Sequence, residues 1–126
     1  MLIVPNGKIC YLEIPAVDAE TSAGFYAKVF GWNIRVRGDG ARGFDDTTGG
    51  VSGSWVLGRQ PSREPGVLTH VMVDSIADTL KKVSAAGGQT VTPLTPISAG
   101  GEAYATFRDP AGNLFGLYQE RGSVTP

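Results

Sequence analysis

The sequence contains the same pattern twice, and this internal repeat constrains the fold more than any other feature. Residues 11–31 align with residues 68–88 at an offset of 57 positions. Further along the chain the offset becomes 63, and it pairs Phe44, Asp46, Gly49, Gly53 and Trp55 with Phe107, Asp109, Gly112, Gly116 and Tyr118. A duplicated unit predicts two similar modules related by a pseudo-twofold axis, with a shared cleft between their equivalent faces.

Each unit predicts one strand, one helix and three further strands. Asp18 is suited to cap the first helix, in which apolar residues recur every three or four positions until Gly31. A doubly wound parallel sheet fits less well, because it needs a helical crossover between successive strands and each unit has only one helix. We therefore predict an α+β fold with curled mixed sheets around a shared cleft. The expected parts are one domain over 1–126, with module one at 7–58, a linker at 59–66 and module two at 67–120.

The charged residues give no sign of a polyanionic partner. Eleven Lys and Arg residues balance twelve Asp and Glu residues, and they are scattered without runs. We therefore expect neither nucleic-acid nor membrane binding. No apolar run approaches the ~18 residues that span a bilayer. The single cysteine, Cys10, excludes an intramolecular disulfide and fits a reducing compartment, so we expect a soluble cytoplasmic protein with Cys10 in its core.

Three segments resemble the vicinal oxygen chelate superfamily, which includes glyoxalase I, extradiol dioxygenases, fosfomycin-resistance enzymes and bleomycin-binding proteins. They are Tyr11–Ala16, Phe25–Trp32 and Phe107–Asn113. The resemblance spans about residues 7–120, and it implies paired β-α-β-β-β modules around a cleft. It is specific for the fold and much less so for activity, because fold and function separate in this superfamily. Relatives often dimerise, sometimes by exchanging modules, so it also implies a homodimer.

The resemblance further implies where a metal would be held. Metal-dependent relatives draw His, Glu or Gln ligands from the first and last strands of each module, at positions that fall here on Tyr11, Gly53, Leu68 and Gly116. Three of these residues have no donor side chain, and a catalytic site needs about three protein ligands. The chain also has only one histidine, whereas non-haem iron usually takes two. We therefore expect no metal and no other cofactor, with an atypical divalent site as the disfavoured alternative.

Strand alternation predicts which side chains face the cleft instead. Tyr11 and Glu13 share one face of their strand, and Leu68, His70 and Met72 share the equivalent face. Glycines inside strands leave room where a ligand comes close, and aromatic residues flank them. The predicted ligand-binding residues are Tyr11, Gly53, Trp55, Leu68, Met72, Gly116 and Tyr118.

Glu13 and His70 are equivalent by the repeat and form the predicted polar pair of the cleft. They are either a general acid and base acting on a bound carbonyl or enol, or a structural hydrogen-bonded pair. Asp45 and Asp46 are adjacent, so we assign them to a tight turn, and Asp109–Asn113 to another with a role in the fold.

These residues favour a metal-independent protein that binds a small molecule of the kind bleomycin-binding relatives take up. The alternatives are a glyoxalase-like lyase or isomerase that uses Glu13 and His70, and a dioxygenase-like enzyme with an atypical metal site. The sequence leaves open whether the protein is an enzyme.

Overall fold

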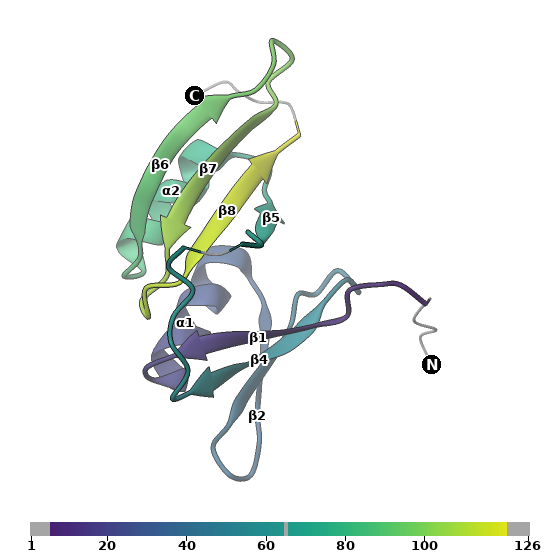
Figure 1. The fold of residues 1–126 in the computed structure, drawn as a ribbon, viewed down its shortest axis with the longest axis vertical. Helices are drawn as coiled ribbons and strands as arrows, with labels where there is room; N and C mark the ends of the chain where they lie inside the picture. Colours follow the sequence, from purple (N-terminus) through teal and green to yellow (C-terminus); the bar gives the residue numbers. More distant parts are fainter. Residues whose placement is uncertain (1–5, 65, 121–126) are drawn as a thin grey trace.

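The computed structural model describes residues 6–64 and 66–120, which form two modules of the same build (Figure 1). Module one consists of β1 (Tyr11–Ala16), α1 (Ala19–Phe30), β2 (Asn33–Val36), β3 (Arg42–Asp45) and β4 (Ser52–Leu57). Module two consists of β5 (His70–Met72), α2 (Ile76–Ala85), β6 (Gln89–Pro96), β7 (Ala103–Arg108) and β8 (Leu114–Gln119).

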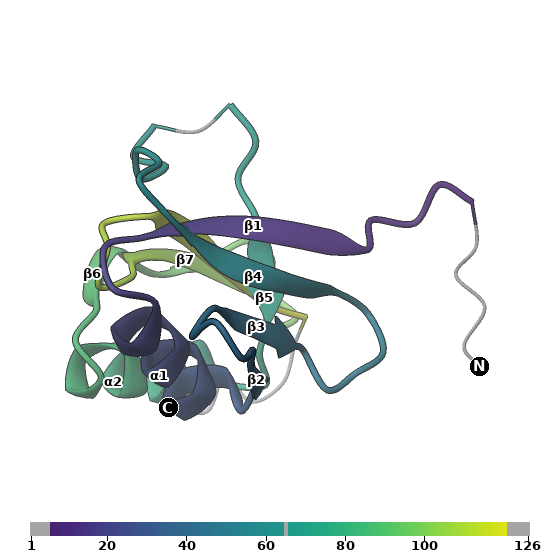
Figure 2. The same cartoon turned by 90° about the horizontal axis from the view of Figure 1, so that it is seen from below.

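Each module folds into one mixed four-stranded sheet. The strand orders are β1-β4-β3-β2 and β5-β8-β7-β6, and the first pair in each sheet is parallel while the others are antiparallel. The two helices lie side by side, and both lie on the same side of the strands (Figure 2). The predicted α+β fold of tandem β-α-β-β-β modules is confirmed.

The helix boundaries follow from local capping. Asp18 accepts a hydrogen bond from the Thr21 amide at 3.0 Å, and α1 ends at Gly31, whose φ of 75° suits glycine. Ser75 caps α2 in the same way. In the described part of the chain, neither helix is both long enough and apolar enough to cross a membrane.

The two modules share one aromatic core. Tyr26 of α1 is fully buried and meets Phe115 of β8 with ring centroids 5.6 Å apart, while Phe25 meets Phe107 of β7 at 5.9 Å. Edge-to-face and tilted aromatic pairs of this kind add to the burial of apolar surface. Helix α1 of module one therefore packs directly on the sheet of module two.

The turn between β7 and β8 fastens the modules together. Tyr26 donates its hydroxyl to Asp109 Oδ2 at 2.8 Å, and Asn113 donates its side-chain amide to the Pro15 carbonyl at 2.7 Å. The Ser62 amide in turn donates to Asn113 Oδ1 at 2.8 Å. The segment that we assigned to a turn thus joins residues from both modules and the linker.

The strand register corrects one part of the repeat alignment. The turn between β3 and β4 comprises residues 46–51, whereas the turn between β7 and β8 comprises residues 109–113 and is one residue shorter. Phe44 therefore pairs with Gly53, but Phe107 pairs with Phe115. The pairing of Gly53 with Gly116 is wrong, and so is that of Trp55 with Tyr118, because a one-residue shift moves a strand residue to the other face.

The residues of β4 and β8 that correspond to each other in the repeat can be identified from their pairing partners on β1 and β5. Glu13 lies opposite Ser54, and His70 lies opposite Gly116. The counterpart of Gly116 is thus Ser54, and by the same register the counterpart of Trp55 is Leu117. The equivalence of Glu13 and His70 is retained.

One further expectation differs from the structure. Cys10 is exposed, because it precedes β1 rather than lying within it. Strand β6 includes Pro93 and ends at Pro96; these prolines are tolerated because β6 is an edge strand, and its pairing with β7 has two register shifts.

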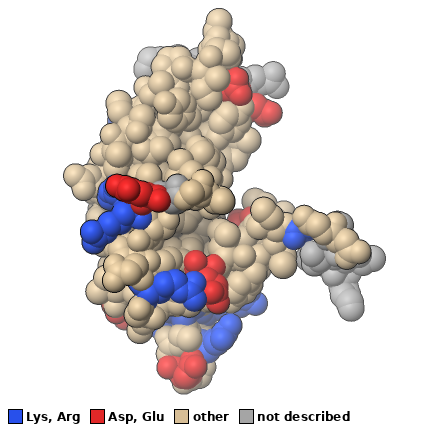
Figure 3. Space-filling model, viewed as in Figure 1, with Lys and Arg blue, Asp and Glu red and all other residues tan. Residues whose placement is uncertain are grey.

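The surface agrees with the scattered charge of the sequence. On the face drawn in Figure 3, acidic and basic groups lie next to one another, and neither sign forms an extended patch.

Candidate functional site

A cavity of about 300 Å³ lies between the two modules. One wall comes from β1, the end of α1, β3 and the turn after it, and the other from β5 and the start of β8. Its lining residues are Leu12, Phe30, Trp32, Phe44, Asp46, Thr47, Thr48, Val51, Thr69, His70, Val71, Met72 and Phe115. A largely apolar cavity with a few polar groups is the usual form of a small-molecule site.

The apolar wall is a rigid aromatic layer. Trp32 stacks on Phe44 with centroids 4.4 Å apart and an interplanar angle of 13°, and Trp55 packs behind Phe44 at 4.9 Å. Tyr26 stacks on the other side of Trp32 at 4.9 Å. Because these rings support each other from the core, the wall is already formed without a ligand.

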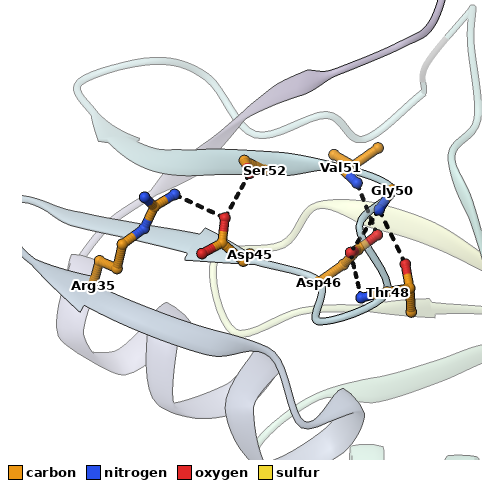
Figure 4. Close-up of polar contacts among 7 residues, drawn as sticks. All are labelled: Arg35, Asp45, Asp46, Thr48, Gly50, Val51 and Ser52. Atoms are coloured by element: carbon orange, nitrogen blue, oxygen red, sulfur yellow. Dashed lines mark hydrogen bonds and ion pairs between the residues drawn. The ribbon is translucent and has the colours of Figure 1, made fainter. Parts of the chain in front are cut away.

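The polar wall is the turn that starts at Asp46 (Figure 4). Asp46 Oδ1 accepts the amides of Thr48 at 2.9 Å and Gly50 at 3.2 Å, and Oδ2 accepts the Val51 amide at 2.9 Å. Partial burial raises the pKa of Asp46, but these hydrogen bonds outweigh it and hold the pKa below its usual value. The group is therefore ionised at neutral pH.

The same turn holds a strained residue. Thr47 has a φ of 65°, a left-handed conformation that is uncommon for a β-branched side chain. Such conformations persist where the surrounding structure fixes them, and they cluster at functional sites. Sequence reasoning treated Asp46 only as a turn residue and missed its place in the cavity wall.

Two of the predicted site residues line the cavity, namely His70 and Met72. His70 lies against Gly116, where an added Cβ would be 2.4 Å from its Cδ2 atom. The imidazole of His70 therefore occupies the space that a side chain at position 116 would take.

Glu13 and His70 are not brought together. Glu13 forms an ion pair with Arg59 of the linker at 2.9 Å, and both side chains are about half exposed. Glu13 instead lines a separate, smaller hollow of about 120 Å³ with Val67 and Leu114. Among the hydrogen bonds and ion pairs of residues 6–64 and 66–120, none joins Glu13 to His70.

The remaining predicted residues lie outside the cavity. Trp55 is 4% exposed in the core, and an added Cβ at Gly53 would lie 2.5 Å from the Phe44 ring. Tyr118 donates its hydroxyl to Glu102, and this hydrogen bond raises the pKa of Tyr118. Tyr11 and Leu68 are outside the lining as well.

Sequence reasoning also missed much of the apolar lining. Phe30, Trp32 and Phe44 look like core residues in the repeat, and only the packing of module two beside them shows that they also face a cavity.

The donor set does not fit the metal site that the resemblance implies. The resemblance puts these positions at Tyr11, Gly53, Leu68 and Gly116. In the observed register Gly116 corresponds to Ser54 and Gly53 to Phe115, so either pairing adds at most one hydroxyl group as a donor, and the His70 ring lies over Gly116. Within the described part of the chain, no three His, Cys, Asp or Glu side chains are placed to hold one ion. A catalytic metal needs about three such ligands.

Comparison with known proteins agrees with this architecture. In Didymella fabae, a glyoxylase-like domain-containing protein is 24% identical over 127 residues, covering 95% of this chain and 99% of its own. A solved glyoxalase/bleomycin resistance protein/dioxygenase family enzyme from Burkholderia phytofirmans superposes with a TM-score of 0.73 at 19% identity, over 90% of this chain and 98% of that one. A fosfomycin resistance protein from Listeria monocytogenes gives 0.72 at 17% identity, over 98% and 97%.

A family model also matches residues 8–117, which is most of the chain. Its description is Glyoxalase/Bleomycin resistance protein/Dioxygenase superfamily. The match includes the residues that line the cavity, the turn that joins the modules and all of the two modules except the end of β8. The chain therefore belongs to the glyoxalase/bleomycin resistance protein/dioxygenase superfamily.

Proposed function

We propose that this protein binds a small organic molecule, without a metal, in the cavity between its modules. The observation that carries the proposal is the lining: a preformed aromatic layer and a carboxylate lie in the wall from module one, and an imidazole lies in the wall from module two. The cavity volume of about 300 Å³ matches the lower end of small-molecule sites. The poor set of metal ligands supports binding that needs no ion.

Tryptophan fluorescence provides the test, because Trp32 lines the cavity. A neutral bicyclic aromatic probe such as 2-naphthol is expected to change the emission and to raise the melting temperature, since a ligand of the native state stabilises it. Thr69→Phe, at the residue directly before β5, would fill the cavity and is expected to weaken binding about tenfold or more.

Thr90→Phe is the matched control, because Thr90 on β6 lies outside the cavity lining. Equal loss of probe binding in both variants, or probe binding that Thr69→Phe leaves unchanged, would contradict the proposed location.

A glyoxalase-like lyase or isomerase is the enzymatic alternative, and His70 in the cavity wall is the observation that favours it. In that case His70→Phe and Glu13→Gln would each abolish turnover of a hemithioacetal and leave ligand binding largely intact. The ion pair of Glu13 with Arg59 speaks against a shared role for the two residues. Turnover that depends on an added divalent ion would contradict the metal-independent proposal.

We also propose that the protein is a cytoplasmic homodimer. The free Cys10 supports a reducing location. In the described residues, β1 and β5 each end a sheet with one edge unpaired, and such edges readily pair with another chain. Light scattering is expected to give twice the 13.2 kDa mass of the chain. A mass that stays monomeric up to high protein concentration would contradict the dimer.

A further inference from the structure

The described lining of the cavity includes one carboxylate side chain. Among the described lining residues, Asp46 is the sole Asp, Glu, Lys or Arg, and His70 is the only other titratable group. A carboxylate ligand or a phosphate would therefore meet a negative charge without a compensating Lys or Arg. A positively charged group would meet a fixed carboxylate beside aromatic rings.

The repeat shows what the carboxylate of this turn can do. Asp109 is the equivalent of Asp46, and both accept two amides of their own turn, from residues two and four positions later. In Asp109, Oδ2 also accepts the Tyr26 hydroxyl, a donor from the opposite module. In Asp46, Oδ2 accepts the Val51 amide, no side chain of the opposite module bonds to it among the described residues, and Asp46 is one of the residues that line the cavity.

The Asp46 carboxylate also forms no ion pair among the described residues. The neighbouring Asp45 is paired with Arg35 at 2.9 Å and accepts the Ser52 hydroxyl at 2.6 Å (Figure 4). Asp46 forms no such ion pair within the described residues. Lys8 reaches the same turn, but its ammonium donates to the Gly50 carbonyl and lies beyond ion-pair distance of the Asp46 carboxylate.

From these contacts we propose that the cavity selects small organic cations. The ligand class is an amine, protonated at neutral pH, attached to a flat apolar body. The ammonium group takes the place at Asp46 that the Tyr26 hydroxyl takes at Asp109, and the apolar body lies against Trp32 and Phe115.

Three probes of similar size and different charge test this selectivity: 2-phenylethylamine, 2-phenylethanol and phenylacetate. In calorimetric titrations of the full chain, the amine is expected to bind about tenfold more tightly than the alcohol, and phenylacetate most weakly. Asp46→Asn should abolish the advantage of the amine, so that amine and alcohol bind to the variant with equal affinity. The ratio of the two affinities within one variant is the readout, because any change of the turn that follows from the loss of an acceptor for the backbone amides affects both probes.

Asp45→Asn is the matched control, since Asp45 carries the same charge one residue away but lies outside the lining. It is expected to leave the preference for the amine intact. The selectivity rests on the proposed function. The probes therefore distinguish a cavity that has no preference for cations from a cavity that binds no small molecule. Equal binding of amine and alcohol, or a preference that survives Asp46→Asn, overturns cation selectivity and leaves the cavity as the site. Failure of all three probes to bind at millimolar concentration overturns the cavity proposal itself.

Discussion

Replacing Asp109 by alanine is expected to lower the free energy of unfolding by about 3–5 kcal/mol. Asp109 is 4% exposed, and its carboxyl group accepts four hydrogen bonds, from Tyr26, Ala111 and both the backbone and side-chain amides of Asn113. Tyr26 and Asn113 are almost fully buried, so their donors would lose this partner without gaining water. Each buried donor left unpaired costs about 1–3 kcal/mol.

The protonation of Tyr26 supports this arrangement. Burial, and next the neighbouring Asp109 carboxyl group, raise the pKa of Tyr26 well above its usual value, so its hydroxyl remains a donor at neutral pH. Tyr26→Phe removes one of the four donors and is expected to cost about 1–2 kcal/mol.

Urea unfolding followed by circular dichroism measures both effects, provided that the slope with denaturant stays constant. Asp39→Ala is the matched control, because Asp39 also accepts an amide two residues later but lies in an exposed turn. Its expected cost is below about 1 kcal/mol. A similar stability of Asp109→Ala and Asp39→Ala would mean that the module junction does not depend on this carboxyl group.

The second large effect is expected at Gly53, where alanine should cost about 3 kcal/mol of stability. An added Cβ would lie 2.3 Å from the Leu12 carbonyl oxygen and 2.5 Å from Phe44 Cζ. Neither neighbour can move freely: the first is backbone paired with β4, and the second is a fully buried ring stacked on Trp32. Overpacking of a rigid core is destabilising because it forces backbone shifts.

Gly116→Ala provides the contrast within the same protein. Its Cβ would also be too close to a neighbour, but that neighbour is the exposed imidazole of His70, which can rotate away. The expected loss of stability is below about 1 kcal/mol. Thermal unfolding of the two variants, monitored by tryptophan fluorescence, compares them directly. Equal destabilisation at both positions would show that the two glycines are equivalent after all.

The fold could be predicted because the relevant signals are local and repeated. Asp18, the apolar spacing of the first helix and Gly31 define α1 without reference to the rest of the chain. The second copy of the same signals gives the modular order. The sequence could not predict which residues of β4 and β8 lie on equivalent faces of the two sheets. That correspondence depends on a turn that is one residue shorter in module two.

The candidate site was less predictable than the fold. Strand alternation predicts His70 and Met72 on the cleft face, and both line the cavity, but Thr69 and Val71 line it as well, so alternation alone does not define this wall. Arg59 and Glu13 could not be paired from sequence, since the linker path decides that contact. Asp46 was recognised as a turn former, yet only the position of module two reveals that its turn is also a cavity wall.

The hydrogen bond between Tyr26 and Asp109 has a consequence for the order of events during synthesis. It joins residues 83 positions apart, and the bond from Asn113 to Pro15 spans 98 positions. When module one has emerged from the ribosome, the residues that pair with its helix α1 have not yet been made. Contacts of such long range slow folding, because the chain must close a large loop before they form. Module one therefore stays incomplete until almost the last strand is synthesised, and it is exposed to aggregation during that interval.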